Sequence, residues 1–207
     1  MKKGLILIIA VAMVVLPMFS CSRYGPPPEM EEVYDRLVEV IEESHEVNVL
    51  LFGAGLPTYA RGDAEDDLIH RYYNFSDSTR EYVTPYAKFA TITDMREAIA
   101  RVYGSEYRES LMESLFTGYA DTGVSVSLPA RYSEDEKAMY QNKNITPLVT
   151  GTRVYDYAGM RMLKGSNQRY IKVEIRSYTE DCPEEWVKVT LSFVYENGNW
   201  YLNSPSC

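Results

Sequence analysis

Apolar residues recur at three- and four-residue intervals between positions 29 and 52, a pattern that predicts a long amphipathic helix. Acidic residues fill most of the other positions of this stretch. Gly53 and Gly55, followed by Pro57, predict where the helix ends, because glycine tolerates the left-handed backbone of helix termini and proline cannot continue a helix. The expected buried face consists of Val33, Leu37, Val40, Ile41, Val47, Asn48 and Leu51.

Two shorter helices are expected after position 90. Asp94 begins the first of them, with Glu97 three residues later as in a capping box. Gly104-Ser105 stops this helix and caps the next one. The inward-facing residues are expected to be Met95, Ile99 and Val102 in the first helix, and Leu111, Met112, Leu115 and Phe116 in the second.

The remaining pattern predicts strands. Edge strands rich in Tyr, Phe and Val are expected at 71–75 and 81–90, after a polar loop at 62–67. From Ala130 onward, apolar and polar residues alternate with the period of two that is typical of half-buried strands. The later strands are expected at 130–132, 138–141, 152–163, 170–178, 186–195 and 199–202.

This order of elements predicts the fold class. Helices followed by a run of antiparallel strands indicate a single α+β domain over 29–207, with N-terminal helices packed on one face of a twisted antiparallel sheet. Gly159 marks a bulge within its strand, and Asn197-Gly198 is a strong signal for a two-residue hairpin turn. The last three strands should therefore form a C-terminal meander.

The first 20 residues have the plan of a secretory signal peptide, with two lysines before an apolar run at 5–19. That run is shorter than the about 20 residues that a membrane-spanning helix needs. The segment 18–21 resembles a lipobox, so we expect lipid attachment at Cys21 and a Pro-rich tether over 21–28, which would place the protein on the extracytoplasmic face of the membrane. Two alternatives stay open: cleavage after Ser22, which would secrete the protein, and an uncleaved anchor.

The chain is acidic, with a formal net charge of −9, and loss of Lys2 and Lys3 with the signal peptide would make it more negative still. Such a chain is repelled by nucleic acid and by anionic headgroups, so no nucleic-acid partner is expected. Much of the negative charge falls on the helix at 29–52, where a solvated face is the simplest interpretation.

With Cys21 assigned to the lipid, Cys182 and Cys207 remain. Two further cysteines in an exported chain predict a disulfide between them. The expected meander supports this pairing, because it brings the C-terminal segment to the end of the sheet where the connection 179–185 lies. Two free thiols are the alternative.

No catalytic centre is evident, so we expect neither an enzyme nor a cofactor or metal site. His45 lies among the acids of the first helix and is interpreted as a surface residue. His70 follows Asp66 and Asp67 at helical spacing, an arrangement that could hold a metal or a proton, although a local ion pair is the simpler interpretation. The sequence contains no Gly-x-Ser-x-Gly elbow, Gly-rich phosphate loop or calcium loop. A carboxylate-based enzyme is the remaining catalytic alternative.

Tyrosine is the most unusual part of the composition. With 18 tyrosines in the chain, several fall on alternate positions of neighbouring strands. A row made of Tyr155, Tyr157, Tyr170 and Tyr178 would form a surface able to stack on a sugar or grip a peptide. The alternative is that these side chains pack under the helices with their hydroxyls reaching solvent.

The run from Asn48 to Pro57 resembles a segment of small lipoproteins common in Clostridia and their relatives. The resemblance continues through 93–116, 130–132 and 197–205, and so touches most of the chain after the tether. The layout of helices followed by strands is also similar to that of the IseA family, secreted inhibitors of cell-wall DL-endopeptidases, and to cystatin-like and NTF2-like sheets. The last two host many functions.

The expected function is that of a cell-surface lipoprotein with a non-catalytic binding domain, one that binds or inhibits a cell-wall hydrolase. The alternative is a solute- or glycan-binding lipoprotein with a tyrosine-lined cavity in its sheet. Both need export and a tether, and they differ in whether the partner is a cell-wall protein or a small molecule or glycan.

Overall fold

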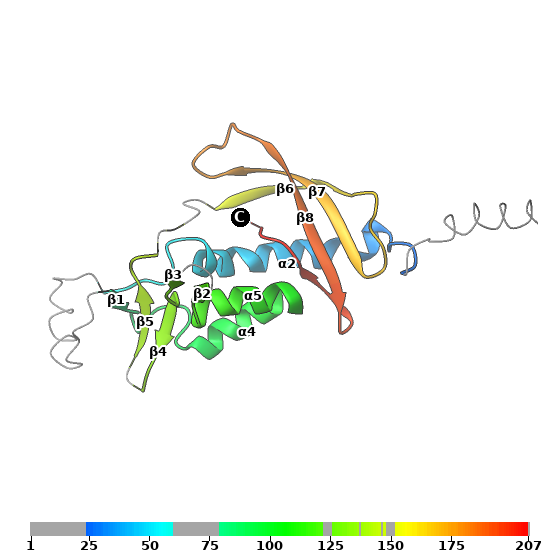
Figure 1. The fold of residues 1–207 in the computed structure, drawn as a ribbon. Helices are drawn as coiled ribbons and strands as arrows, with labels where there is room; N and C mark the ends of the chain where they lie inside the picture. Colours follow the sequence, from blue (N-terminus) through cyan, green and yellow to red (C-terminus); the bar gives the residue numbers. More distant parts are fainter. Residues whose placement is uncertain are drawn as a thin grey trace, which may run out of the picture.

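A 22-residue helix, α2 (Met30–Leu51), runs beneath a four-stranded antiparallel sheet in this computed structural model (Figure 1). A reciprocal capping box begins the helix, in which the Glu29 side chain accepts a hydrogen bond from the Glu32 backbone and the Glu32 carboxylate accepts one from the Glu29 amide. All seven residues expected on its inner face are buried. The structure describes residues 24–59, 79–121, 126–136, 138–145, 147 and 152–206.

Two shorter helices, α4 (Ile92–Val102) and α5 (Ser105–Phe116), follow as expected. The capping box of α4 lies three residues earlier than expected: Thr91 Oγ1 accepts from the Asp94 amide at 3.1 Å, and Asp94 Oδ2 accepts from the Thr91 amide at 3.0 Å. A threonine hydroxyl at this position satisfies a free amide of the first turn, so the helix begins before Asp94. Met95, Ile99 and Val102 are buried, and α4 packs against α2.

The large sheet contains β6 (Arg153–Met162), β7 (Tyr170–Thr179), β8 (Val187–Glu196) and β9 (Asn199–Leu202) in that order, which confirms the C-terminal meander. Asn197 and Gly198 turn the β8–β9 hairpin with positive φ angles of 51° and 85°. The bulge expected at Gly159 is confirmed, because the register between β6 and β7 shifts between Asp156 and Arg161.

A second sheet, which the sequence did not separate from the first, lies at the other end of α2 (Figure 1). It contains β1 (Arg80–Tyr82), β5 (Met139–Asn142) and β4 (Tyr132–Glu134) in that order. The strand expected over 81–90 is confined to β1, since turns surround Pro85. A short unpredicted hairpin consists of β2 (Tyr119–Asp121) and β3 (Val126–Leu128). The features expected at 62–67 and 71–75 lie outside the described residues.

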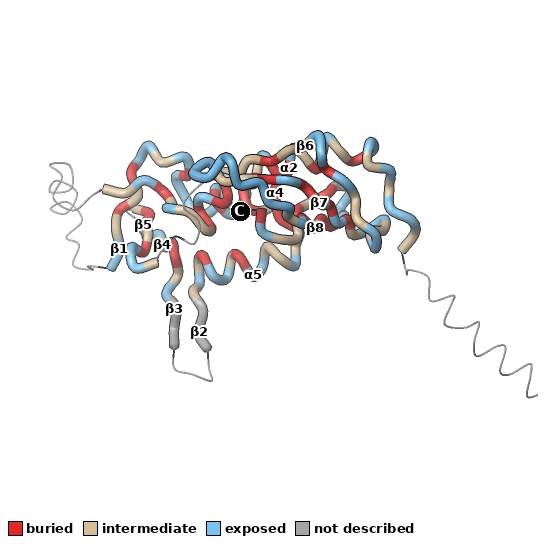
Figure 2. Tube along the Cα trace, turned by 90° about the horizontal axis from the view of Figure 1, so that it is seen from above, coloured by how far each residue is buried: buried red, intermediate tan, exposed pale blue. Residues whose placement is uncertain are grey.

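The main core lies between α2, α4 and the inner face of the large sheet, where buried positions concentrate (Figure 2). β7 contributes every second residue to this core, as its alternation predicted. These elements confirm the α+β class, with the helices on one face of the large sheet. Fully buried side chains in the core include Leu37, Ile41, Ile99, Ile171, Ile175, Phe193 and Leu202.

Polar side chains form a closed hydrogen-bond network inside this core. Ser44 Oγ donates to the Ile41 carbonyl and contacts Ser206 Oγ at 2.6 Å, and Asn48 Nδ2 donates to Ser206 Oγ at 2.9 Å. The Tyr103 hydroxyl donates to Asn48 Oδ1 at 2.8 Å, and the Tyr155 hydroxyl donates to the Ser206 carbonyl at 2.5 Å. The C-terminal segment is therefore fixed to both α2 and β6 by hydrogen bonds that lie within the buried core.

A second network joins the end of α2 to the small sheet. Arg131, only 5 % exposed, donates from Nη2 to the Gly53 carbonyl, and so supplies a cation to a helix whose last turn contains no basic residue. Gln141 donates to the Ala54 carbonyl at 3.0 Å and accepts from the Leu56 amide at 2.8 Å. Two of the segments that carry the lipoprotein resemblance, 48–57 and 130–132, thus meet here.

Replacement of Gly55 by alanine should destabilise the protein. Gly55 has a φ of +88°, and an added Cβ would lie 2.2 Å from Gln141 Oε1, which accepts the Leu56 amide. We expect Gly55→Ala to lower the free energy of unfolding by about 2–3 kcal/mol. Gly165→Ala, at φ +91° with nothing within 4 Å, is the control and should cost only about 1 kcal/mol. Equal losses in urea unfolding would contradict a steric role for Gln141.

Removal of the Asn48 side chain should open the buried network. Asn48→Ala deletes both the acceptor of the Tyr103 hydroxyl and the donor to Ser206. We expect a loss of about 2–4 kcal/mol in the free energy of unfolding. Val49→Ala is the matched control on the same helix, because Val49 is 46 % exposed and its truncation should change stability by less than about 0.5 kcal/mol. Thermal unfolding of the two variants compares them directly, and a similar stability for both would contradict the role given to Asn48.

Candidate functional site

The four tyrosines expected to form one row lie on two different sides of the large sheet. Tyr155 pairs in register with Ser177, which is buried toward the helices, so Tyr155 faces α2. Tyr178 pairs with Val154 and shares the opposite side of β7 with Tyr170, because side chains alternate along a strand. No single stack of these four residues exists for a ligand to contact.

Tyr155 and Tyr157 belong to the interface between β6 and α2. Tyr155 is 7 % exposed, and the Tyr157 hydroxyl donates to a carboxylate oxygen of Glu42 on the helix. Burial, followed by the hydrogen bond to Glu42, raises the pKa of Tyr157 above its usual range. His45, expected to be a surface residue, is half-buried, and its ring centroid lies 6.0 Å from that of Tyr155. These tyrosines therefore pack the protein instead of lining a cavity.

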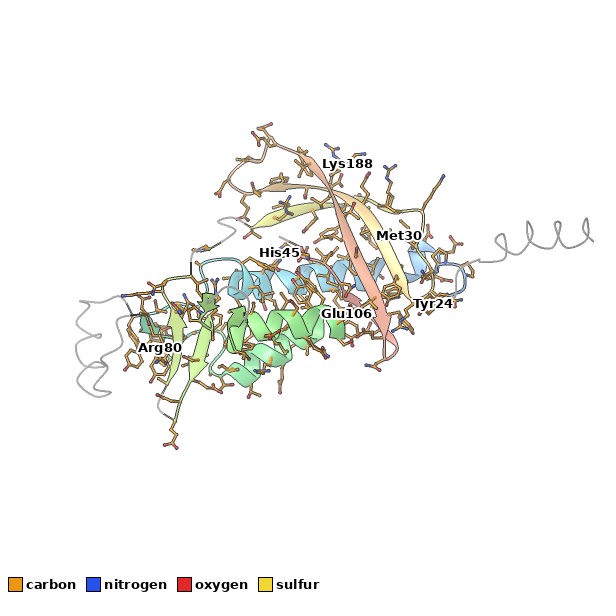
Figure 3. The ribbon with its side chains drawn as sticks, viewed as in Figure 1. Tyr24, Met30, His45, Arg80, Glu106 and Lys188 are labelled. Atoms are coloured by element: carbon orange, nitrogen blue, oxygen red, sulfur yellow. The ribbon has the colours of Figure 1, made fainter. Side chains whose placement is uncertain are left out.

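The described part of the Pro-rich tether, from Tyr24 onward, is held on the domain. The Gly25 carbonyl accepts from the Gln168 amide at 3.3 Å, and the Tyr24 ring meets the Tyr170 ring edge-on at 6.2 Å. Arg169 donates to the Tyr24 hydroxyl at 3.3 Å and lies over both rings. The tether therefore runs against the β6–β7 turn before it enters α2, at the end of the molecule opposite Arg80 (Figure 3).

An open groove of about 750 Å³ lies between this tether and the large sheet. Its volume falls within the range of about 300–1,000 Å³ that is common for ligand sites. The three prolines of the tether form one wall, and the first turn of α2 closes one end. The remaining lining residues are Glu29, Glu32, Val33, Gln168, Arg169, Tyr195 and Trp200.

An aromatic pair forms the apolar surface of the groove. The β8–β9 hairpin places Tyr195 opposite Trp200 in register, with ring centroids 5.1 Å apart. Trp200 is 7 % exposed and therefore rigid, whereas Tyr195 is 43 % exposed and free to contact a ligand. Glu196, next along β8, accepts from the Ser105 amide and hydroxyl at 2.9 Å, which holds the hairpin against α5.

The groove combines an aromatic surface with hydrogen-bonding groups. Gln168 and Arg169 offer donors among its lining residues, and the carboxylates of Glu29 and Glu32 also line it. Both carboxylates already bond to the helix backbone, which fixes their positions but commits part of their hydrogen-bonding capacity. Such an arrangement can stack on a sugar ring or an extended peptide and bond its polar groups. It offers no activated nucleophile among its lining residues.

Several residues singled out from the sequence lie outside the described residues: Cys21, Asp66, Asp67, His70 and Cys207. Cys182 is exposed and forms no disulfide within the described part of the chain, so its pairing with Cys207 stays a prediction. In the described ranges no group of three or more His, Cys, Asp or Glu side chains is placed to hold a metal ion. The same residues contain no helix long and apolar enough to cross a membrane.

Comparison with known proteins assigns no family, because neither a protein-family model nor a curated protein matches this chain.

The groove was not predicted from the sequence. Its two signals, the proline run and the Asn-Gly hairpin with flanking Tyr195 and Trp200, were each visible. Only the packing of the tether on the β6–β7 turn brings them together.

Tyr24 should control how firmly the tether is held. We expect Tyr24→Ala to raise the rate of tryptic cleavage after Arg23 about fivefold, because the lost ring and hydroxyl contacts stabilise the docked state by about 1 kcal/mol. The melting temperature should stay within about 1 °C, since the core is untouched. Tyr86→Ala at the far sheet, where Tyr86 is 70 % exposed, is the control. Unchanged cleavage of the Tyr24 variant would mean that the tether is not held by this contact.

Proposed function

We propose that this chain is a lipid-anchored, non-catalytic binding protein of the extracytoplasmic surface, whose groove beside the tether binds a glycan segment. The observation that carries the proposal is the groove itself, with the exposed ring of Tyr195 beside the buried Trp200 and polar groups among its lining residues. Carbohydrates present alternating apolar ring faces and hydroxyl groups, which an aromatic surface with a polar rim complements.

The position of the groove supports a role close to the membrane. Its proline wall is the tether, and docked Tyr24 stands three positions after the proposed lipid site at Cys21, a reach of at most about 11 Å. A glycan bound in the groove would therefore lie near the membrane surface. The lining residues include no pairing of a nucleophile with a base, which supports binding over catalysis.

The acidic side of α2 favours a second candidate, a basic protein partner such as a cell-wall hydrolase. Glu31, Asp35, Glu39 and Glu46 are exposed on this helix, and complementary charge speeds encounter with a basic surface. Inhibition of a wall hydrolase should then weaken when Glu31→Gln and Asp35→Asn are combined. Glycan binding should not change in that variant, because neither residue lines the groove.

Tyr195 provides the direct test of the proposed glycan site. A β-1,4-linked N-acetylglucosamine pentasaccharide, titrated calorimetrically into the protein, should bind, and Tyr195→Ala should weaken it about tenfold through the loss of ring stacking. Tyr195→Phe keeps the ring and should bind within about twofold of the parent. Because Tyr195 is largely outside the core, stability should change little.

Two outcomes would overturn the glycan proposal. One is the absence of any heat of binding for this pentasaccharide and for solubilised wall glycan. The other is equal affinity of the parent and Tyr195→Ala, which would place the binding site elsewhere. If the protein inhibits a hydrolase through Glu31 and Asp35 and binds no glycan, the second candidate function, on the acidic side of α2, would replace the first.

A further inference from the structure

The side of the large sheet turned away from α2, here called the outer face, is polar along β7. Its β7 side chains alternate with Ile171, Val173 and Ile175, which are buried toward the helices. Along β7 no described helix lies on this side (Figures 1 and 2). At the β8–β9 end the start of α5 meets this side, where Val194 is buried opposite Tyr170 and Glu196 accepts from Ser105. The β7 residues of the outer face are Tyr170, Lys172, Glu174, Arg176 and Tyr178.

Cations from three strands gather on this face. Arg161 of β6 contacts Glu174 Oε1 through Nη2 at 2.6 Å, and Lys188 of β8 reaches the same oxygen at 3.0 Å. These bonds, from Lys188 first and then Arg161, lower the pKa of the Glu174 carboxyl. Lys172 and Arg176 are exposed and form no ion pair with a described residue. One carboxylate thus serves two cations, and two further cations remain available to a partner.

The outer face is an exception within an acidic protein. The chain carries a net charge of −9, yet this face has four cations against three acids, Glu174, Asp156 beside the bulge and Glu196 at the end of β8. The acids of α2 lie on the other side of the sheet, while Lys188 lies on the side away from His45 and the helix (Figure 3). A molecule with its charge separated in this way orients in an anionic field with the outer face forward.

Aromatic side chains lie at both ends of the same face. Tyr24 and Tyr170 meet at the tether end. At the other end the Tyr178 ring contacts Trp186 edge-on at 4.7 Å, and Arg176 lies 5.0 Å from the Trp186 ring centroid. Trp186 is 42 % exposed. Tyrosine and tryptophan beside Lys and Arg are typical of surfaces that lie at the headgroup level of a bilayer.

We infer that the outer face lies against an anionic lipid surface, with Tyr170 at one edge of the contact and Trp186 at the other. The inference rests on the proposed anchoring at Cys21. The two edges are separated by eight residues of β7, about 26 Å. The acids of the β7–β8 connection at 180–185 lie beyond Trp186 in the chain direction away from β8, so the contact ends at Trp186.

Continuity with the tether favours lipid over a soluble polyanion or an acidic protein. Tyr24, the first described residue of the tether, packs on Tyr170 of the outer face, so a lipid attached three positions earlier would begin near the edge of this surface. Basic residues beside a lipid anchor add electrostatic attraction to anionic headgroups. The middle of the face carries no exposed large apolar side chain of the kind that a protein interface would bury.

The test uses Trp186 as a reporter in the full chain. Trp200→Phe, present in every protein compared, leaves Trp186 as the only tryptophan. The chain is reconstituted in brominated phosphatidylcholine vesicles with or without phosphatidylglycerol, and flotation confirms that it is anchored. We expect phosphatidylglycerol to increase quenching of Trp186 by the brominated chains. The double variant Lys172→Glu, Arg176→Glu should disfavour the state in which the outer face lies on the bilayer about tenfold or more, and so remove most of this quenching.

The matched control, Lys143→Glu with Arg101→Glu, changes two exposed cations away from the outer face and so alters the net charge equally. It should quench like the parent. Equal quenching with and without phosphatidylglycerol, or an equal loss in the control, would overturn the inference. So would a Trp186 response to soluble polygalacturonate but not to vesicles, which would assign the face to an anionic polymer. Pentasaccharide binding to the groove, measured with Trp200 intact, reports separately on the proposed function.

Discussion

Two polar side chains within the apolar face of α2 hold the rest of the structure in place. Ser44 and Asn48 are buried, and such groups are costly unless every hydrogen bond is made. Here each is satisfied by a segment distant in sequence: Tyr103 after α4 and Ser206 beyond β9. Because Tyr155 of β6 also bonds to Ser206, one cluster fixes the helix, both edges of the large sheet and the C-terminal segment in a single arrangement.

That arrangement positions both surfaces that are exposed to a partner. The large sheet uses its inner face to cover α2, so its outer face is left to solvent and carries charge. The start of α2 must then meet the β8–β9 hairpin, which creates the groove between the tether and Trp200. The end of α2 is fixed separately, by Arg131 and Gln141 of the small sheet. The two ends of one helix therefore differ in their surroundings: the start lines the groove, and the end joins the small sheet.

Local patterns predicted most of the helices and strands and the C-terminal meander, but not the β2–β3 hairpin, the separate small sheet or the side chains that each face presents. The stripe of α2, the alternation of β7 and the Asn197-Gly198 turn each depend on neighbouring residues, and each was found in place. The side of the sheet that Tyr155 faces depends on its register with Ser177. The bulge at Gly159 shifts the register between this pair and the β6–β7 turn, so the four tyrosines form two pairs on opposite sides of the sheet. The docking of Tyr24 depends on contacts across about 145 residues, which no local periodicity encodes.

The docked tether has a consequence for how often a ligand is met. An undocked proline-rich spacer, being extended and stiff, would hold the groove away from the bilayer, whereas the contacts of Tyr24 and Gly25 keep the domain close to the point of attachment. For a chain attached at Cys21 as proposed, the groove would sample only a thin layer of material next to the membrane. Within that layer its effective concentration is high, so even a weak affinity for each site would give substantial occupancy. Glycan farther out would remain out of reach.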